Sequence, residues 1–116
     1  MTSARDTFAT MRLLRGVLSK DNPHLKQIGT TIIVNLHHIH HCEVYCGRPS
    51  QWGNPFIIDR DGNRTEVLTK YGRYLSSHMR LVRLAKTELL GKSIGCFCLP
   101  LPCHLEILIG CAMEIT

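Results

Sequence analysis

Long apolar segments and the common enzyme signatures are both absent from this chain of 116 residues. No run of eighteen or more apolar residues occurs, so we expect no membrane-spanning helix. The first residues contain no continuous apolar segment and no small-residue cleavage site, so we also expect no secretory signal and a cytoplasmic location. The phosphate-binding loop, the G-x-G-x-x-G fingerprint, H-E-x-x-H and G-x-S-x-G are all missing. The usual cofactor and hydrolase classes are therefore not indicated.

Acidic residues are also few, with nine Asp and Glu against fourteen Lys and Arg, which gives a formal net charge of +5. The excess positive charge lies between residues 60 and 92, a segment that contains eight basic and three acidic residues. This segment favours an anionic partner such as a nucleotide phosphate or nucleic acid. A solvated helix face explains the same pattern. Basic residues interleaved with Tyr71 and Tyr74 would suit a phosphate backbone. These basic residues are Lys70, Arg73, Arg80, Arg83 and Lys86.

Hydrophobic periodicity and turn residues predict a small α/β domain. Helices are expected at 4–19, 64–76, 77–90 and 102–115, and strands at 30–36, 43–46 and 93–98. The crossover between the first and last strands is long enough for parallel pairing. We therefore predict a Rossmann-like sandwich of two or three layers with a short, mainly parallel sheet. Residues 30–116 would form this single domain, and residues 1–29 an N-terminal helical extension that offers a surface for a homodimer or another partner.

Half of the six cysteines and a histidine occur between residues 96 and 104. Without an export signal these thiols are expected to be reduced. The types and number of Cys96, Cys98, Cys103 and His104 suit a structural zinc site, so zinc is the metal we consider although no cofactor is firmly indicated. The spacing C-x-C-x4-C-H is not that of a zinc knuckle. Adjacent residues at a helix start, such as Cys103 and His104, are also expected to point in different directions.

Two other interpretations of this cluster remain open. Pro102 can occupy the first turn of a helix, where free backbone N–H groups lower the pKa of a thiol and hold anions. A strand, a turn with prolines and a helix start together form a natural ligand edge in an α/β sheet, and this would make Cys98, Cys103 and His104 site residues. Alternatively, the cysteines are small apolar core residues.

The loop at residues 47–55 is a second candidate site. Arg48 could grip a phosphate, Ser50 supplies a hydroxyl, Trp52 could stack on a ring, and Asn54 could hydrogen-bond an amide-like edge. Trp52 could equally anchor the loop on the core.

The run His37-His38-Ile39-His40-His41 alternates as a strand would, with His38 and His40 on one face. No second metal motif lies nearby. We therefore interpret the run as a solvated loop, with transition-metal binding as the alternative.

Two separated motifs resemble those of a family of small domains of unknown function found mostly in phages and bacteria. The first resembles G-R-x-S-x-W-G-N-P-F and is carried by Gly47, Arg48, Ser50, Trp52, Gly53, Asn54, Pro55 and Phe56. The second resembles G-C-x-C-x-P-L-P-C-H-G-D and is carried by Gly95, Cys96, Cys98, Pro100, Leu101, Pro102, Cys103 and His104. The match covers about residues 30 to 112. It implies a phage or prokaryotic protein, in the host cytoplasm if phage-encoded, but no settled activity.

The chain departs from this pattern where Leu105-Glu106 replaces the usual Gly-Asp. Glu106 keeps a carboxylate, whereas Leu105 loses the small residue that would let a ligand approach the backbone closely.

The leading hypothesis is that the loop at 48–56 and the turn at 98–106 lie side by side and bind a nucleotide-like anion. In hydrolysis or group transfer, Arg48 would grip phosphate, Trp52 would stack, and His104, Glu106 or Cys103 would act in catalysis. A competing hypothesis is a non-enzymatic module that docks on a host or defence protein and is stabilised by zinc. A third is nucleic-acid binding through the basic helices.

Overall fold

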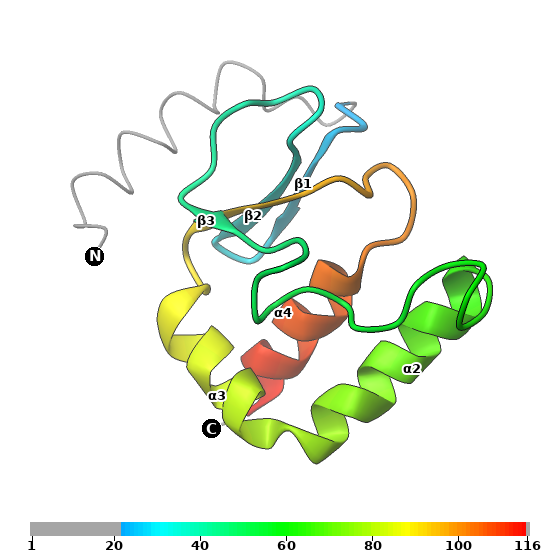
Figure 1. Ribbon diagram of the computed structural model, residues 1–116. Helices are drawn as coiled ribbons and strands as arrows, with labels where there is room; N and C mark the ends of the chain where they lie inside the picture. Colours follow the sequence, from blue (N-terminus) through cyan, green and yellow to red (C-terminus); the bar gives the residue numbers. More distant parts are fainter. Residues whose placement is uncertain (1–21, 116) are drawn as a thin grey trace.

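The computed structural model describes residues 22–115, and a four-stranded sheet forms one layer of the fold (Figure 1). The strands are β1 (Leu25–Ile28), β2 (Thr31–Asn35), β3 (Val44–Tyr45) and β4 (Ser93–Cys96), arranged in the order β1-β2-β4-β3. Both β2 and β3 pair parallel to β4, and β1 pairs antiparallel to β2. The predicted α/β class and the mostly parallel sheet are confirmed, whereas the Rossmann-like layering stays a prediction.

Strand β1 lies inside the segment that the sequence pattern assigned to a helical extension. Its residues, Leu-Lys-Gln-Ile, are apolar only at the two ends, so neither helical nor strand periodicity is evident. Pairing with β2 from Leu25 opposite Val34 to Ile28 opposite Thr31 makes it a strand. The sheet therefore begins before the predicted boundary at residue 30. The predicted helix at 4–19 lies outside the described residues.

Helix α2 (Arg64–Ser77) begins where the sequence predicts, at a capping box. The Asn63 side chain accepts a hydrogen bond from the Glu66 backbone N–H at 2.9 Å, and Glu66 Oε1 accepts one from the Asn63 N–H at 3.0 Å. Two N–H groups that no helical carbonyl can reach are thereby satisfied.

Replacing Asn63 with Ala is expected to lower the free energy of unfolding by about 1 kcal/mol, since the cap accepts a hydrogen bond from a helix N–H that would otherwise be left unpaired. Urea unfolding measures this change. Asn63→Ser, which keeps a capping oxygen, serves as the control and should retain most of the stability. Equal losses in the two variants would contradict a capping role.

Helices α3 (Met79–Glu88) and α4 (His104–Glu114) complete the described elements. The chain leaves α3 through Gly91, whose φ of +84° is readily adopted only by glycine. The N-cap of α4 is Cys103, so Pro102 precedes this helix rather than occupying its first turn as predicted. A second capping box stabilises the first turn of α4. Glu106 Oε1 accepts a hydrogen bond from the Cys103 N–H, and the Cys103 sulfur accepts one from the Leu105 N–H.

All three described helices lie on one side of the sheet (Figure 1). Ile33 and Ile94 face them and join the main core, and Ile32 and Val34 on the opposite face pack with Ile39. This is the alternation expected of a strand. Among the described residues, no helix is long and apolar enough to cross a membrane.

Candidate functional site

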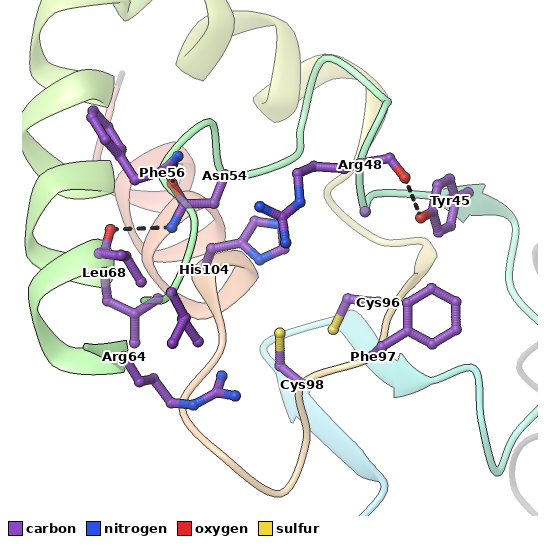
Figure 2. Close-up of a pocket in the computed structure, with 13 residues that line it drawn as sticks. Tyr45, Arg48, Asn54, Phe56, Arg64, Leu68, Cys96, Phe97, Cys98 and His104 are labelled. Atoms are coloured by element: carbon purple, nitrogen blue, oxygen red, sulfur yellow. Dashed lines mark hydrogen bonds between the residues drawn. The ribbon is translucent and has the colours of Figure 1, made fainter. Parts of the chain in front are cut away.

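A pocket of about 330 Å³ opens between the loop after β3, the start of α2 and the end of β4 (Figure 2). These three segments, far apart in the sequence, form one hollow together with His104. Its lining combines basic, aromatic and sulfur-bearing side chains with small and aliphatic ones. The lining residues are Tyr45, Gly47, Arg48, Asn54, Phe56, Ile58, Arg64, Val67, Leu68, Cys96, Phe97, Cys98 and His104.

Arg48 and Arg64 approach this pocket from different sides (Figure 2). Arg48 lies in the loop that follows β3, and Arg64 is the first residue of α2, where Nη1 donates to the Pro102 carbonyl at 3.1 Å. The ion pairs within residues 22–115 are Lys26–Glu106 and Arg60–Asp61, so neither pocket arginine is neutralised by a described carboxylate. None of the described lining residues is acidic. The pocket therefore favours an anion.

Asn54 lines the pocket, and its amide also holds the surrounding loop together. Nδ2 donates to the Val67 carbonyl at 3.1 Å, and Oδ1 accepts from the Phe56 N–H at 2.9 Å. One amide N–H of Asn54 remains for a ligand. The side chain thus positions Phe56 and the pocket wall at once.

Trp52 and Ser50 do not line the pocket. The Trp52 side chain is buried in the main core with 3% exposure, and its carbonyl accepts a hydrogen bond from the Tyr71 hydroxyl at 2.9 Å. Burial keeps its ring from stacking on a ligand in this pocket, so the alternative role as a loop anchor fits the structure. Ser50 Oγ is buried without a hydrogen-bond partner in the described structure.

The thiols of Cys96, Cys98 and Cys103 converge, with their sulfur atoms all within 4.8 Å of one another. The Cys96 and Cys103 sulfurs are 3.1 Å apart. Cys96 ends β4, Cys98 lies in the following turn and Cys103 caps α4, so the strand–turn–helix geometry gathers them. The site contains three thiol ligands that could hold a metal ion.

Hydrogen bonding within this cluster shifts the pKa values of the three thiols in different directions. Hydrogen bonds from Cys103 and then Cys96 lower the pKa of Cys98, outweighing its burial. Hydrogen bonds to Cys96 and Cys98 raise the pKa of Cys103, and its burial adds to this. The pKa of Cys96 is raised to about 11. Its hydrogen bond with Cys103 lowers this pKa, but its hydrogen bond with Cys98 and its burial together raise it by more. Of the three thiols, Cys98 therefore loses its proton most readily.

His104 lies beside the same sulfurs, with Nδ1 3.8 Å from Cys103 Sγ. The expectation that Cys103 and His104 diverge is therefore wrong at the level of these atoms. Nε2 donates to the Cys46 carbonyl at 3.0 Å, and the ring packs edge-on against Tyr71 with centroids 5.3 Å apart. Its exposure is only 6%, although it borders the pocket.

Glu106 lies outside the pocket and lines a separate hollow beside Leu99 and Pro100. Its carboxylate pairs with Lys26 at 2.5 Å and accepts the Cys103 N–H. Its two oxygens are thus used for an ion pair and a helix cap. A direct role as acid or base in the pocket is not compatible with this position.

The pocket lining includes one arginine and three aromatic residues that were not predicted as site residues from the sequence: Arg64, Tyr45, Phe56 and Phe97. Phe97 and Tyr45 are exposed by 46% and 38%, and their rings make an edge contact at 6.1 Å. Arg64 follows directly after the recognisable cap Asn63, so its place at the start of a helix was predictable. Its direction toward the cysteines depends on how α2 packs.

The histidine run forms a turn rather than an alternating strand. Its four histidines are exposed, and Ile39 between them is buried. His38 stacks on His24 with ring centroids 3.7 Å apart. The prediction of a surface loop is confirmed, and the strand-like sharing of faces is wrong.

Apart from Arg64, the basic side chains of α2 and α3 do not line the pocket. Lys70 Nζ donates a hydrogen bond to the Asp61 carbonyl at 2.6 Å. The other basic residues of interest on these two helices are exposed: Arg73, Arg80, Arg83 and Lys86. None of them lines the pocket.

The family model described as "Domain of unknown function (DUF4326)" matches residues 34–114. This region includes the end of β2, all of β3, β4 and the three described helices, and every residue that lines the pocket. No curated protein and no solved structure matches the chain. The chain thus belongs to the DUF4326 family of domains of unknown function.

Proposed function

We propose that this domain binds a phosphate-bearing, nucleotide-like ligand in the pocket between Arg48 and Arg64. The observation that carries the proposal is the convergence of two arginines, neither paired with a described carboxylate, on a hollow whose described lining contains no Asp or Glu. A guanidinium is suited to bidentate hydrogen bonding with phosphate. The volume of about 330 Å³ is at the small end of ligand pockets and suits a mononucleotide-sized group or part of one.

The aromatic rim supports the nucleotide part of this proposal. Phe97 and Tyr45 are partly exposed at the pocket, and Phe56 lies on the opposite wall in Figure 2. Every nucleobase has a face that stacks on such rings, at about 1–3 kcal/mol per base. In this proposal Phe97 and Tyr45 take the stacking role that the sequence suggested for Trp52.

Binding is better supported than turnover. Hydrolysis or group transfer needs a positioned acid or base, and His104 is the candidate that borders the pocket. Nε2 of His104 is already occupied by the Cys46 carbonyl, and Glu106 lies elsewhere. We therefore propose a ligand-binding role first.

Calorimetric titration with nucleoside mono-, di- and triphosphates and inorganic phosphate tests the proposal. Arg48→Ala and Arg64→Ala should each weaken binding about 10- to 100-fold, because each removes a charge-assisted hydrogen bond worth about 1.5–3 kcal/mol. Arg83→Ala, which removes the same charge from an exposed site on α3, is the matched control and should bind as the wild type does.

Two outcomes would overturn this proposal. One is that the wild type binds none of these phosphates. The other is that all three arginine variants lose affinity equally, which would indicate a general effect of net charge rather than a pocket.

A second candidate function rests on the three converging thiols. We propose that Cys96, Cys98 and Cys103 hold a zinc ion that stabilises the domain as a protein-interaction module. Three sulfur ligands within 4.8 Å of one another match the soft donors that zinc prefers. Metal analysis of protein purified without chelator should give one zinc per chain, and a metal-free protein that keeps its full stability would contradict this role.

A further inference from the structure

The protonation of His104 can be derived from its hydrogen bond to Cys46. A backbone carbonyl only accepts, so the contact of 3.0 Å between His104 Nε2 and the Cys46 oxygen requires a proton on Nε2. In the neutral ring Nδ1 then carries a lone pair. Because both the ring and the Cys46 carbonyl are held in the core, the orientation of this lone pair is set by the fold.

The lone pair on Nδ1 lies next to the thiol cluster. Nδ1 is 3.8 Å from Cys103 Sγ, and the sulfurs of Cys96 and Cys98 lie within 4.8 Å of that same sulfur. In a tetrahedral zinc site, bond lengths of about 2.3 Å to sulfur and 2.0–2.1 Å to nitrogen place ligand atoms about 3.6–3.8 Å apart. The nitrogen already has this spacing from Cys103. The Cys96 and Cys103 sulfurs, at 3.1 Å, would move apart by about 0.7 Å to admit the ion.

We infer that Nδ1 of His104 is the fourth ligand of a closed tetrahedral zinc site formed with Cys96, Cys98 and Cys103. This inference rests on the second candidate function above, which supplies the three thiolates. A histidine that donates its other ring N–H to a backbone carbonyl is the usual outer-shell arrangement of a metal ligand. The Leu105 N–H, which lies 3.4 Å from Cys103 Sγ, would support the negative charge of that thiolate.

A closed site has a consequence for the pocket. Cys96, Cys98 and His104 all border the hollow that contains Arg48 and Arg64. With four protein ligands the zinc keeps no open position for water or substrate, so it would hold the pocket wall in place rather than take part in chemistry. The metal and the anion are thus separate ligands of adjoining sites.

Cobalt substitution of the reduced, full-length protein tests the inference. Tetrahedral Co²⁺ gives intense visible bands, and thiolate ligands add charge-transfer absorption in the near ultraviolet. His104→Ala should weaken Co²⁺ binding by at least about 100-fold, since even the loss of an outer-shell partner costs 10- to 100-fold. His104→Cys, which restores a fourth soft ligand, should recover tight binding with stronger charge-transfer absorption. A double variant with His40→Ala and His41→Ala controls for binding to the exposed histidine turn and should behave as the wild type.

Nitrogen NMR of the zinc-loaded wild type provides a second measurement that needs no substitution. We expect the His104 ring to carry its proton on Nε2 and to show a metal-shifted Nδ1 resonance. A proton on Nδ1, or unchanged Co²⁺ affinity in a folded His104→Ala variant, would overturn the fourth ligand and leave the three-thiolate proposal standing. If the wild type binds neither Co²⁺ nor Zn²⁺, both proposals fall, whereas phosphate binding is judged separately by calorimetry.

Discussion

Replacing Leu105 with Gly is expected to lower the free energy of unfolding by about 2–5 kcal/mol, the range found for truncation of a large buried aliphatic side chain. Leu105 has no exposed surface and packs in the main core. The loss comes from the cavity, because glycine in the first turn of a helix, where Leu105 lies, disturbs fewer helical hydrogen bonds than in the middle. The single tryptophan, Trp52, is buried and gives a fluorescence signal for urea unfolding.

Leu101→Gly is the matched control for this substitution. The same side chain is removed, but Leu101 lies in the turn between β4 and α4 and is 52% exposed. Its loss should cost less than about 1 kcal/mol. Similar losses at the two positions would show that Leu105 does not fill the core. The glycine that the family motif has at residue 105 would therefore destabilise this chain.

Tyr71→Ala is expected to destabilise the domain by a comparable amount, about 3–5 kcal/mol. Tyr71 is fully buried at the centre of the core, between the loop of Trp52 and the ring of His104. Its removal takes away the ring that packs against His104, a residue of the pocket lining, and the donor to the Trp52 carbonyl. Urea unfolding gives the change in free energy, and calorimetric phosphate titration of the folded fraction should show weakened binding as well.

Tyr71→Phe separates packing from hydrogen bonding at this position. The ring stays, but the buried Trp52 carbonyl loses its donor, which should cost about 1–3 kcal/mol. Tyr74→Phe is the control, because the hydroxyl of the half-buried Tyr74 has no partner within the described residues. Its effect should stay within about 0.5 kcal/mol. An equal effect of the two changes would contradict the role of the Tyr71–Trp52 hydrogen bond.

Much of the fold follows from local patterns in the chain. Helix α2 begins at Asn63 because that residue and Glu66 satisfy each other's backbone groups, and such a box is visible in the sequence. Strands β2 and β4 were predictable because their short runs are bounded by Gly29, Gly91 and Pro100. Strand β1 was not, because its identity depends on pairing with a neighbour rather than on its own residues.

The residues of the candidate site were likewise predictable only in part. Arg48, Cys98 and His104 were chosen from the sequence, and the structure places all three at one pocket. Trp52 and Glu106 were also chosen, but the first is buried in the core and the second pairs with Lys26 on a different surface. A residue type indicates what a side chain can do, whereas its direction is set by contacts with distant segments.

The order of most elements, the cap of α2 and the chemical character of the cysteine segment were predictable from the sequence, since each depends on residues a few positions apart. Long-range packing is what brings Arg64 and Arg48 to one pocket, places Trp52 in the core, and sets Nδ1 of His104 3.8 Å from Cys103 Sγ. These relations arise where α2, β4 and α4 pack together. No local pattern encodes such packing, because its free energy comes from surfaces that meet only in the folded chain.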